Sequence, residues 1–401
     1  MPEITTPYAL VIIAILVLAG AAASKISTRL NVPVLLVFLG VGIVAGEDVS
    51  GWIVFDNAHM ANALGTLAMA FILFSGGFDT SWKDVKKVIG YGSVLSSVGV
   101  FLTALFVGLF AYFAIFHNNE NIFSETPDAM VLAWCLLLGS IISSTDAAAV
   151  FAILRSRSVS LKGNLKPMLE YESGSNDPMA AFLTLFMVGM IAEPGSASYL
   201  DIPLAFVVKM GLGIGWGIVW GKLAVWLYNH IDLEYDGLYY VLGIGFVMIT
   251  FGSSELLYGN GFMSVYVAGL VMGNSKFVFQ NGLGRFLDGM AWLMQVMLFV
   301  MLGLFVNPSK LPAALPWAIA IALFLMFVAR PVAVFLCMLG SRYSKKERLF
   351  ISWVGLRGGA PIMLVTFPML FNTPRNDLLF EIVLVIVALS VLIQGKTLMP
   401  L

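Results

Sequence analysis

The residues with the clearest capacity for chemistry lie in one short stretch, residues 170–178, which reads Glu-Tyr-Glu-Ser-Gly-Ser-Asn-Asp-Pro. Ser173, Asn176 and Asp177 place a hydroxyl, an amide and a carboxylate within five residues. Oxygen ligands suit hard cations, and a lone carboxylate suits a cation of single charge. Pro178 removes a backbone donor and bends a helix. The stretch predicts a monovalent cation site at Asp177; the alternative is a helix start, capped by Ser or Asn, with Pro in its first turn.

The composition indicates which elements must position these residues. Hydrophobic residues make up 60% of the 401-residue chain and charged residues only 11%, whereas a soluble protein carries about 25% charged residues. Apolar runs of roughly 20 residues, enough to cross a bilayer, recur along the chain, and none alternates as the strands of a membrane barrel do. The prediction is an all-α membrane protein with a single transmembrane domain, residues 1–401, and no soluble domain. The net charge of −1 indicates no nucleic-acid partner, and no motif indicates a cofactor.

We predict about thirteen transmembrane spans. Their ranges are 7–24, 31–46, 60–78, 88–115, 129–154, 166–191, 203–228, 237–256, 260–274, 289–306, 313–337, 347–371 and 378–398. If the N-terminus lies outside, sixteen loop and terminal Lys and Arg residues face the cytoplasm and two, Lys310 and Arg375, face outside. Cytoplasmic loops are rich in Lys and Arg. We therefore expect a multi-pass inner-membrane protein, with its N-terminus outside and its C-terminus cytoplasmic.

Two spans, the fifth and the twelfth, carry polar or flexible residues in their middle. The fifth contains Ser-Ser-Thr145-Asp146, and the twelfth contains Gly355-Leu-Arg357-Gly-Gly-Ala-Pro361. Hydroxyls and a carboxylate can bond to backbone groups freed by unwinding, and glycine and proline disfavour a straight helix. Interrupted spans seven apart run in opposite directions, as in the inverted repeats of transporters, whose binding sites lie at the breaks. For the fifth span, the alternative is an intact helix with a Ser and Thr face.

Several charged residues also fall within predicted spans, where a charge indicates a functional site or a structural pair. They are Asp146, Glu172, Glu255, Arg330 and Arg357. The third span ends Phe-Ser75-Gly-Gly-Phe-Asp79. Its glycines permit close helix packing, and the Ser75 hydroxyl is a candidate oxygen ligand for the site.

Taken together, these motifs resemble the NhaP/NHE-like branch of the cation:proton antiporters. The matching segments run in order through essentially the whole chain: Ser144-Thr-Asp146, Glu172-Ser-Gly-Ser-Asn-Asp-Pro178, Gly252-Ser-Ser-Glu255 through Gly269, Ala329-Arg-Pro331 and Gly355-Leu-Arg-Gly-Gly359. The Thr-Asp and Asn-Asp pairs are specific in combination, and the stretch around Ser75 most resembles the bacterial CvrA-type potassium/proton antiporters. The resemblance implies secondary exchange of K⁺, Na⁺ or both for H⁺.

The resemblance also implies an architecture. It implies a homodimer with thirteen spans, a mobile core and two crossed broken helices. The dimerisation part would comprise about residues 1–80 and 230–306, and the ion-transporting core about residues 88–191 and 313–398.

The resemblance further implies roles for individual residues. Asp177 would bind cation and proton alternately, with oxygens from Ser173 and from the backbone at Thr145, and with Asn176 as a neutral partner. Asp146 would compensate the positive ends of the half-helices. Glu172 and Arg357 would form a buried ion pair. Because Asn176 stands where a second acid would lie, we expect one-for-one, electroneutral exchange.

The chain departs from the family pattern in two respects. Family members often carry an acid at the position of Ser75, so the choice between K⁺ and Na⁺ stays open. CvrA-type proteins usually continue into a cytoplasmic ligand-binding tail. Such a regulatory tail is either absent here or lies beyond Leu401.

The alternative functions are a monovalent cation channel and an intramembrane enzyme. Ile89-Gly-Tyr-Gly92 faintly resembles a potassium filter, but it follows a charged run and lacks the preceding Thr. The chain contains no His-Glu-x-x-His or Gly-x-Ser-x-Gly motif, and no P-loop that would indicate ATP-driven transport. The motifs therefore favour a transporter that is not an enzyme.

Overall fold

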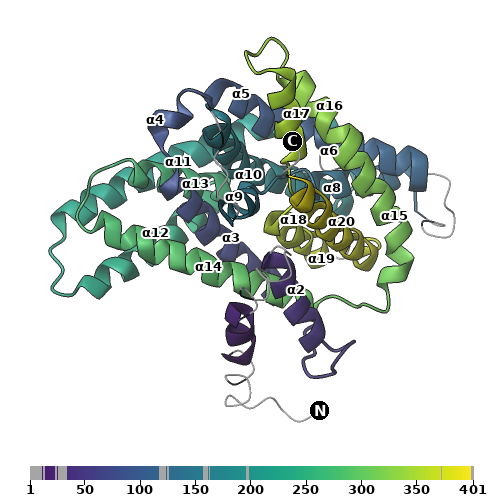
Figure 1. Cartoon of the computed structure of the whole chain (residues 1–401), viewed down its shortest axis with the longest axis horizontal. Coiled ribbons are helices and arrows are strands. Elements are labelled where there is room, and N and C mark those ends of the chain that lie inside the picture. Colours follow the sequence, from purple (N-terminus) through teal and green to yellow (C-terminus); the bar gives the residue numbers. More distant parts are fainter. Residues whose placement is uncertain are drawn as a thin grey trace.

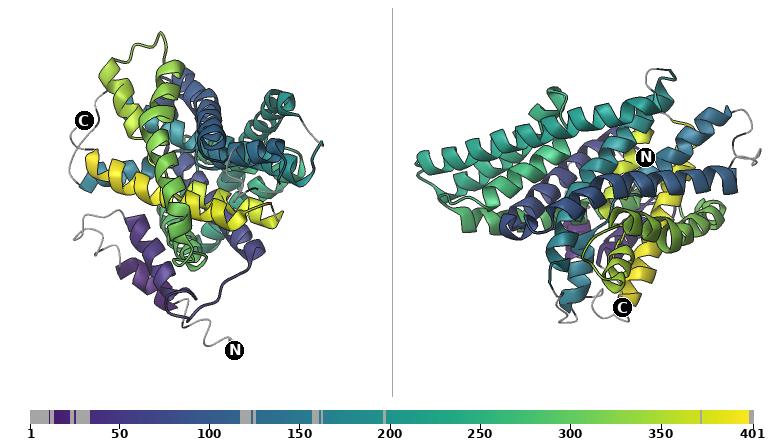
Figure 2. Two further views of the ribbon diagram at one scale, coloured as in Figure 1. Left: turned by 90° about the vertical axis from the view of Figure 1, so that its right-hand side faces the viewer. Right: turned by 90° about the horizontal axis from the view of Figure 1, so that it is seen from above.

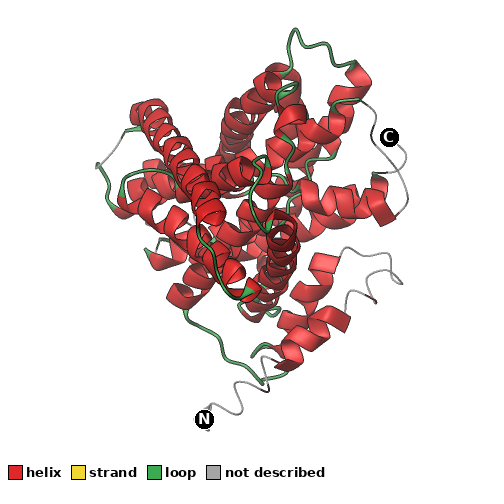
Figure 3. Cartoon of the chain, turned by 90° about the vertical axis from the view of Figure 1, so that its left-hand side faces the viewer, coloured by secondary structure: helices red, strands yellow, loops and turns green. Residues whose placement is uncertain are grey.

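The computed structural model describes residues 11, 14–22, 25, 34–116, 123, 126–156, 161, 163–195, 198–371 and 373–398. Over these residues the regular structure is helical, apart from one isolated β-bridge between Gly46 and Ile53 (Figure 3). The predicted span 7–24 falls only partly on described residues. Three basic residues used to predict the orientation, Arg29, Arg157 and Lys162, lie outside them.

Eight helices of the described chain are long and apolar enough to cross a membrane. Six of them contain α3 (Ala58–Asp79), α10 (Leu165–Ala192), α11 (Ile202–His230, preceded by η3, Tyr199–Asp201), α12 (Asp236–Leu256), α14 (Gln280–Leu304) and α20 (Asn376–Thr397). The other two are composite: α5 (Ile89–Val94), η1 (Leu95–Gly99), α6 (Val100–Ala111) and η2 (Tyr112–Phe116), and then α15 (Leu311–Phe324), η4 (Leu325–Ala329) and α16 (Arg330–Cys337). The element type thus agrees with the predicted all-α fold.

Besides the helical residues 14–22, the described fold contains shorter labelled helices. They are α2 (Val34–Ala45), α4 (Trp82–Val85), α8 (Asp128–Ile141), α9 (Ala147–Ser156), α13 (Gly261–Gly273), α17 (Lys345–Trp353), α18 (Gly359–Leu364) and α19 (Thr366–Leu370). Four of these regions, α2, α8, α13 and the run Gly359–Leu370, are apolar but shorter than a typical span.

The helices form two groups. In one, α13 packs against α3, α11 and α12, while α14 packs against α2 and α3. In the other, α8 packs against α6 and α10, and α15 packs against α20. Figures 1 and 2 show α11 to α14 extending to one side of the molecule, away from α15 to α20. The helices of the first group pack closely, as expected where glycines lie at helix interfaces. A Cβ at Gly77 or Gly269 would collide with a backbone carbonyl of the facing helix.

Two non-helical segments meet between these groups. Residues 142–146 separate α8 from α9, and residues 354–358 separate α17 from α18. The backbone N–H of Asp146 donates a hydrogen bond of 2.7 Å to the Leu356 carbonyl, so one backbone group of each segment has its partner in the other segment. Backbone groups outside helices need such partners when they are buried.

Candidate functional site

A cavity of about 500 Å³ lies beside the two non-helical segments. Its walls come from α3, α9, α10, α13 and α14 and from residues 144–147 and 358–361. Along α10 it is lined by Lys166, Glu170, Ser173 and Asp177, one on each successive turn, because residues three or four apart share a helix face. Lys166 and Glu170 interact at 3.5 Å at one end of this row, and Asp177 stands at the other.

Asp177 lies near the middle of α10, which continues through Pro178 to Ala192. A helix start with Pro in its first turn, the alternative left open by the sequence, is therefore wrong. Asp177 Oδ1 is buried and has no hydrogen-bond partner among the described residues. A buried polar atom without a partner is uncommon and costly. The carboxylate is thus available to a bound ion.

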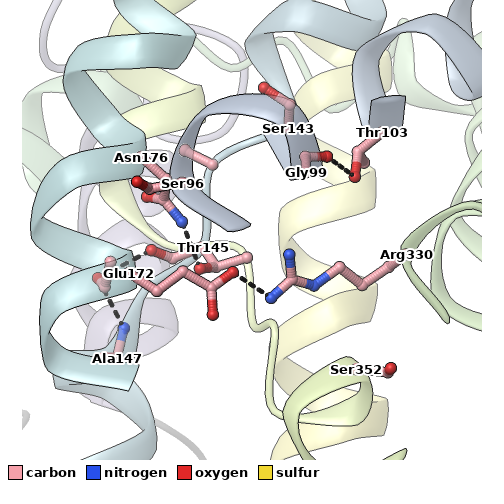
Figure 4. Close-up of polar contacts among 12 residues, drawn as sticks. Ser96, Gly99, Thr103, Ser143, Thr145, Ala147, Glu172, Asn176, Arg330 and Ser352 are labelled. Carbon is pink, nitrogen blue, oxygen red and sulfur yellow. Dashed lines mark hydrogen bonds and ion pairs between the residues drawn. The ribbon is translucent and has the colours of Figure 1, made fainter. Parts of the chain in front are cut away.

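Side chains of α10 also hold the segment that ends at Asp146. The Ser173 hydroxyl donates to the Thr145 carbonyl at 2.9 Å and accepts from the Ala147 N–H at 3.1 Å. Asn176 Nδ2 donates to Thr145 Oγ1 at 2.6 Å (Figure 4). The predicted site residues Ser173, Asn176 and Thr145 are therefore brought together.

Asp146 lies where α9 and α18 begin. Its Oδ1 accepts from the Ala149 N–H at 3.1 Å, in the first turn of α9. Its carboxylate also packs on Gly358, where any Cβ would collide with it. A carboxylate is favoured beside helix N-termini because their backbone N–H groups carry partial positive charge. Asp146 therefore lies beside the first residues of both helices, and its role in compensating their charge stays a prediction.

Arg357 places a positive charge at the C-terminal end of α8. It is 1% exposed, and its Nη1 donates to the Ser143 carbonyl at 2.9 Å and the Ser144 carbonyl at 2.5 Å. These carbonyls follow the C-terminus of α8, where the helix dipole favours a cation. Arg357, in the non-helical segment 354–358, therefore links that segment to the non-helical segment 142–146.

The predicted ion pair between Glu172 and Arg357 is wrong. Glu172 pairs instead with Arg330, whose Nη2 lies 2.5 Å from Glu172 Oε1 (Figure 4). Both side chains are at most 2% exposed. The physical reason is that Arg330 is the first residue of α16, directly after the π-helical turn η4, and faces α10, while the carbonyls after α8 occupy Arg357.

Two further predictions about site residues do not agree with the structure. Ser75 is buried, but it does not line the cavity; its neighbours Gly76 and Asp79 do. Glu255, predicted as a buried charge, is exposed, and its Oε1 accepts from the Gly261 N–H at 2.7 Å near the start of α13. Glu255 therefore supports a loop instead of the cavity.

The sequence interpretation also missed residues that the cavity contains. Ser144, Glu170, Tyr266 and Gln295 line it. Ser144 was within the polar run 143–146, and its position there was the available signal. Tyr266 and Gln295 stand in apolar helices without a local pattern, so only the packing of α13 and α14 reveals them.

Comparisons with known proteins place this geometry in a family. Residues 12–401 match the family model described as "Sodium/hydrogen exchanger, transmembrane". The K(+)/H(+) antiporter NhaP of Alkalimonas amylolytica is 37% identical over 393 residues, covering 98% of this chain and 66% of the relative. The K(+)/H(+) antiporter NhaP2 of Shewanella baltica (strain OS223) is 37% identical over 389 residues, covering 96% of this chain and 64% of the relative. This chain thus spans slightly less than two thirds of the length of these curated relatives.

A more distant relative provides a structural comparison. The Na(+)/H(+) antiporter 1 of Methanocaldococcus jannaschii is 28% identical over 359 residues, covering 86% of this chain and 79% of that protein. A solved structure of the sodium proton antiporter MjNhaP1 from the same organism at pH 8 matches with a TM-score of 0.79 and 23% identity, covering 98% of this chain and 100% of that chain. The structural match shows a shared fold. With the family match over residues 12–401, it establishes that this multi-pass membrane protein belongs to the sodium/hydrogen exchanger family.

Proposed function

We propose that the protein is a secondary antiporter that exchanges K⁺ or Na⁺ for H⁺ across the bacterial inner membrane, with both ions binding at Asp177. The proposal depends on one observation: Asp177 lines the cavity, and its Oδ1 atom is buried there without a hydrogen-bond partner among the described residues. An unpartnered carboxylate in an apolar environment favours uptake of either a proton or a cation. The names of the relatives, K(+)/H(+) and Na(+)/H(+) antiporters, support this choice of ions.

Competition for one carboxylate couples the two ions. A proton on Asp177 removes the charge that holds the cation, and a bound cation favours the ionised form. Asp146 bonds the first turn of α9, and Arg357 bonds the carbonyls after α8. These two charges therefore hold the backbone around the site, while Asp177 exchanges its ion.

The cavity favours alternating access over an open pore. Along α10 it leads from Asp177 towards Lys166, near the basic loops that we assign to the cytoplasm. On the other side of Asp177, Met69, Phe262 and Met363 help to enclose a space with no room for water. We infer that the site opens to the cytoplasm here, and that the opposite opening requires movement of the two helix groups.

We extend the proposal to the topology. In this topology, α8 and α9 are the two halves of one interrupted span, and α17 with α18 and α19 form the halves of the other. The two spans cross in a thirteen-span fold whose N-terminus lies outside. The Asp146 to Leu356 hydrogen bond between the interruptions supports this arrangement. The two helix groups support a division into a dimerisation part and a moving core, and the protein would act as a homodimer.

The test of the proposed function uses purified protein in liposomes with a pH-sensitive dye inside. We expect addition of KCl or NaCl to change the internal pH in a saturable manner, and choline chloride to have no effect. Asp177→Asn should remove the response to every cation. A cation current without proton movement would identify a channel, and no response to any alkali cation would overturn the proposal.

A further inference from the structure

Two unpartnered oxygens share the cavity at its buried end. Ser144 Oγ and Asp177 Oδ1 are both buried without hydrogen-bond partners among the described residues, and both residues line the cavity. In a membrane protein, buried polar groups are satisfied internally. The Ser144 hydroxyl lies close enough to the Asp177 carboxylate to act on it as a donor, although no hydrogen bond of normal geometry joins the two groups. A hydroxyl and a carboxylate left free together point to an ion that both contact.

The oxygens that the family resemblance implies as ligands are already engaged. The Ser173 hydroxyl donates to the Thr145 carbonyl and accepts from the Ala147 N–H. The Thr145 carbonyl thus has one hydrogen-bond partner, and the Thr145 hydroxyl also accepts from Asn176 Nδ2. A hydroxyl has one proton and two lone pairs, so Ser173 retains only one lone pair, whereas the Ser144 hydroxyl retains its full capacity.

The backbone holds Ser144 in place from both sides. Its carbonyl accepts from Arg357 Nη1 at 2.5 Å, and the carbonyl of the next residue, Thr145, accepts from Ser173. Ser144 itself is 0% exposed. A ligand held this way loses little conformational freedom when an ion binds, which favours affinity.

We propose that the Ser144 hydroxyl is a direct ligand of the transported cation beside Asp177 and helps to set the preference between K⁺ and Na⁺. The hydroxyl serves both forms of the site, because it directs a lone pair at a cation and can hydrogen-bond a protonated carboxyl. Ser173, which holds the Thr145 carbonyl and keeps one free lone pair, would contribute an oxygen beside it. This inference rests on the proposed function and names a specificity-determining residue within that site.

Ser143 provides a matched control. It is the same residue type at the adjacent position, it is equally buried, and its carbonyl also accepts from Arg357. Its hydroxyl, however, donates to the Ser140 carbonyl at 2.7 Å, and it does not line the cavity. Loss of the Ser143 hydroxyl therefore leaves the proposed ligand set intact.

The first experiment compares Ser144→Ala with Ser143→Ala in proteoliposomes. We expect Ser144→Ala to raise the KM for the cation about tenfold, the equivalent of one lost neutral contact, and to change the ratio of the K⁺ and Na⁺ KM values. Ser143→Ala should leave that ratio unchanged. As a readout independent of transport, cation-induced thermal stabilisation of the purified protein should need more cation for Ser144→Ala only.

A second pair, Ser144→Cys and Ser143→Cys, covers the case in which the alanine variant does not fold. Sulfur is a poor ligand for hard cations and a better one for soft cations. Ser144→Cys should therefore shift preference from K⁺ towards Tl⁺, and Ser143→Cys should not. Equal KM ratios and equal cation preference in the two members of both pairs would overturn the role of Ser144. Absence of cation-dependent exchange in the unmodified protein would instead overturn the proposed function.

Discussion

Glu172 and Asp177 are two carboxylates on the same helix, α10, with opposite surroundings. Glu172 Oε1 lies 2.5 Å from Arg330 Nη2, and both side chains are almost fully buried. Asp177 Oδ1, little more than one turn further along, has no hydrogen-bond partner among the described residues and belongs to a residue that lines the cavity. The comparison separates a carboxylate that fastens α10 to α16 from one that is available to an ion.

The same contrast explains why the two positions respond differently to substitution. Removing one member of a buried ion pair leaves a charge without compensation, so the cost falls on folding. Removing the charge of an unpartnered carboxylate relieves a desolvation cost, so the cost falls on ion binding. Stability and exchange measurements on matched variants can therefore test the comparison.

The largest expected effect is that of Asp177→Asn. We expect this variant to fold and to lose all cation-dependent proton exchange, because an amide neither titrates nor carries the charge that binds a cation. The measurement is the dye response in proteoliposomes, with thermal stability in detergent as a check on folding. Glu170→Gln is the matched control, since Glu170 lines the same cavity on α10 but interacts with Lys166; it should retain exchange. Exchange by Asp177→Asn would remove Asp177 from the mechanism.

The next largest effect should follow from Arg330→Ala. This change leaves Glu172 buried and unpaired, which costs about 3–5 kcal/mol. We expect low yield of folded protein, partly restored by adding Glu172→Gln, because the second change neutralises the orphaned carboxylate. Size-exclusion profiles and thermal unfolding of the single and double variants provide the measurement.

Arg357→Ala distinguishes the two deeply buried arginines. It should also destabilise the protein, because the carbonyls of Ser143 and Ser144 lose their donor. Glu172→Gln should not restore it, since Glu172 bonds Arg330 and not Arg357. Equal restoration of both arginine variants by Glu172→Gln would contradict the assignment of partners.

The choice of ionic partner illustrates what the sequence could not determine. The composition predicted helices, and the residues around Asp177 predicted the candidate site, because both signals are local. The partner of Glu172 depends on how α10, α16 and the segment 354–358 pack, and two arginines at similar predicted depth were available. Tertiary packing selected Arg330, and neither the Ala329-Arg-Pro331 motif nor the one around Arg357 indicates which arginine pairs with Glu172.

Ser75 shows a second limit, that of helical phase. Successive residues of a helix differ in direction by about 100°, so a shift of one position moves a side chain to another face. The polar and glycine stretch at the end of α3 is evident from the sequence, but only the structure shows that Gly76 and Asp79 line the cavity and Ser75 does not. Glu255 shows the related limit of depth, because it stands close to the end of α12 and is exposed.

A smaller effect is expected from Gly358→Ala. The new Cβ would collide with the Asp146 carboxylate, and forcing extra volume into a packed site costs about 1–3 kcal/mol. We expect lower thermal stability and slower exchange, since segment 354–358 must move away from Asp146. Gly76→Ala is the control, because Gly76 lines the same cavity but a Cβ there meets no atom within 4 Å. Equal stability of the two variants would refute the close packing of Asp146 on Gly358.

The last prediction is that membrane voltage has no effect on the exchange rate. Asn176 is neutral and donates to Thr145 Oγ1, and Asp146 bonds the first turn of α9. Asp177 is then the one carboxylate that exchanges ions, so the loaded site is neutral with either a proton or a monovalent cation. The two loaded forms carry equal charge across the bilayer, and the exchange is one for one.

Voltage would act strongly if a second carboxylate also carried an ion. Moving one uncompensated charge through the membrane changes the free energy by about 2.3 kcal/mol per 100 mV, enough to alter the rate steeply. The measurement uses Na⁺ as the transported ion in proteoliposomes at several potassium gradients, each with and without valinomycin, so that only the voltage differs within each pair. We expect equal rates at every clamped voltage, because each half-cycle moves a neutral site. A steep dependence on voltage would contradict one-for-one exchange and would identify Asp146, the other carboxylate at the buried end of the cavity, as a second carrier.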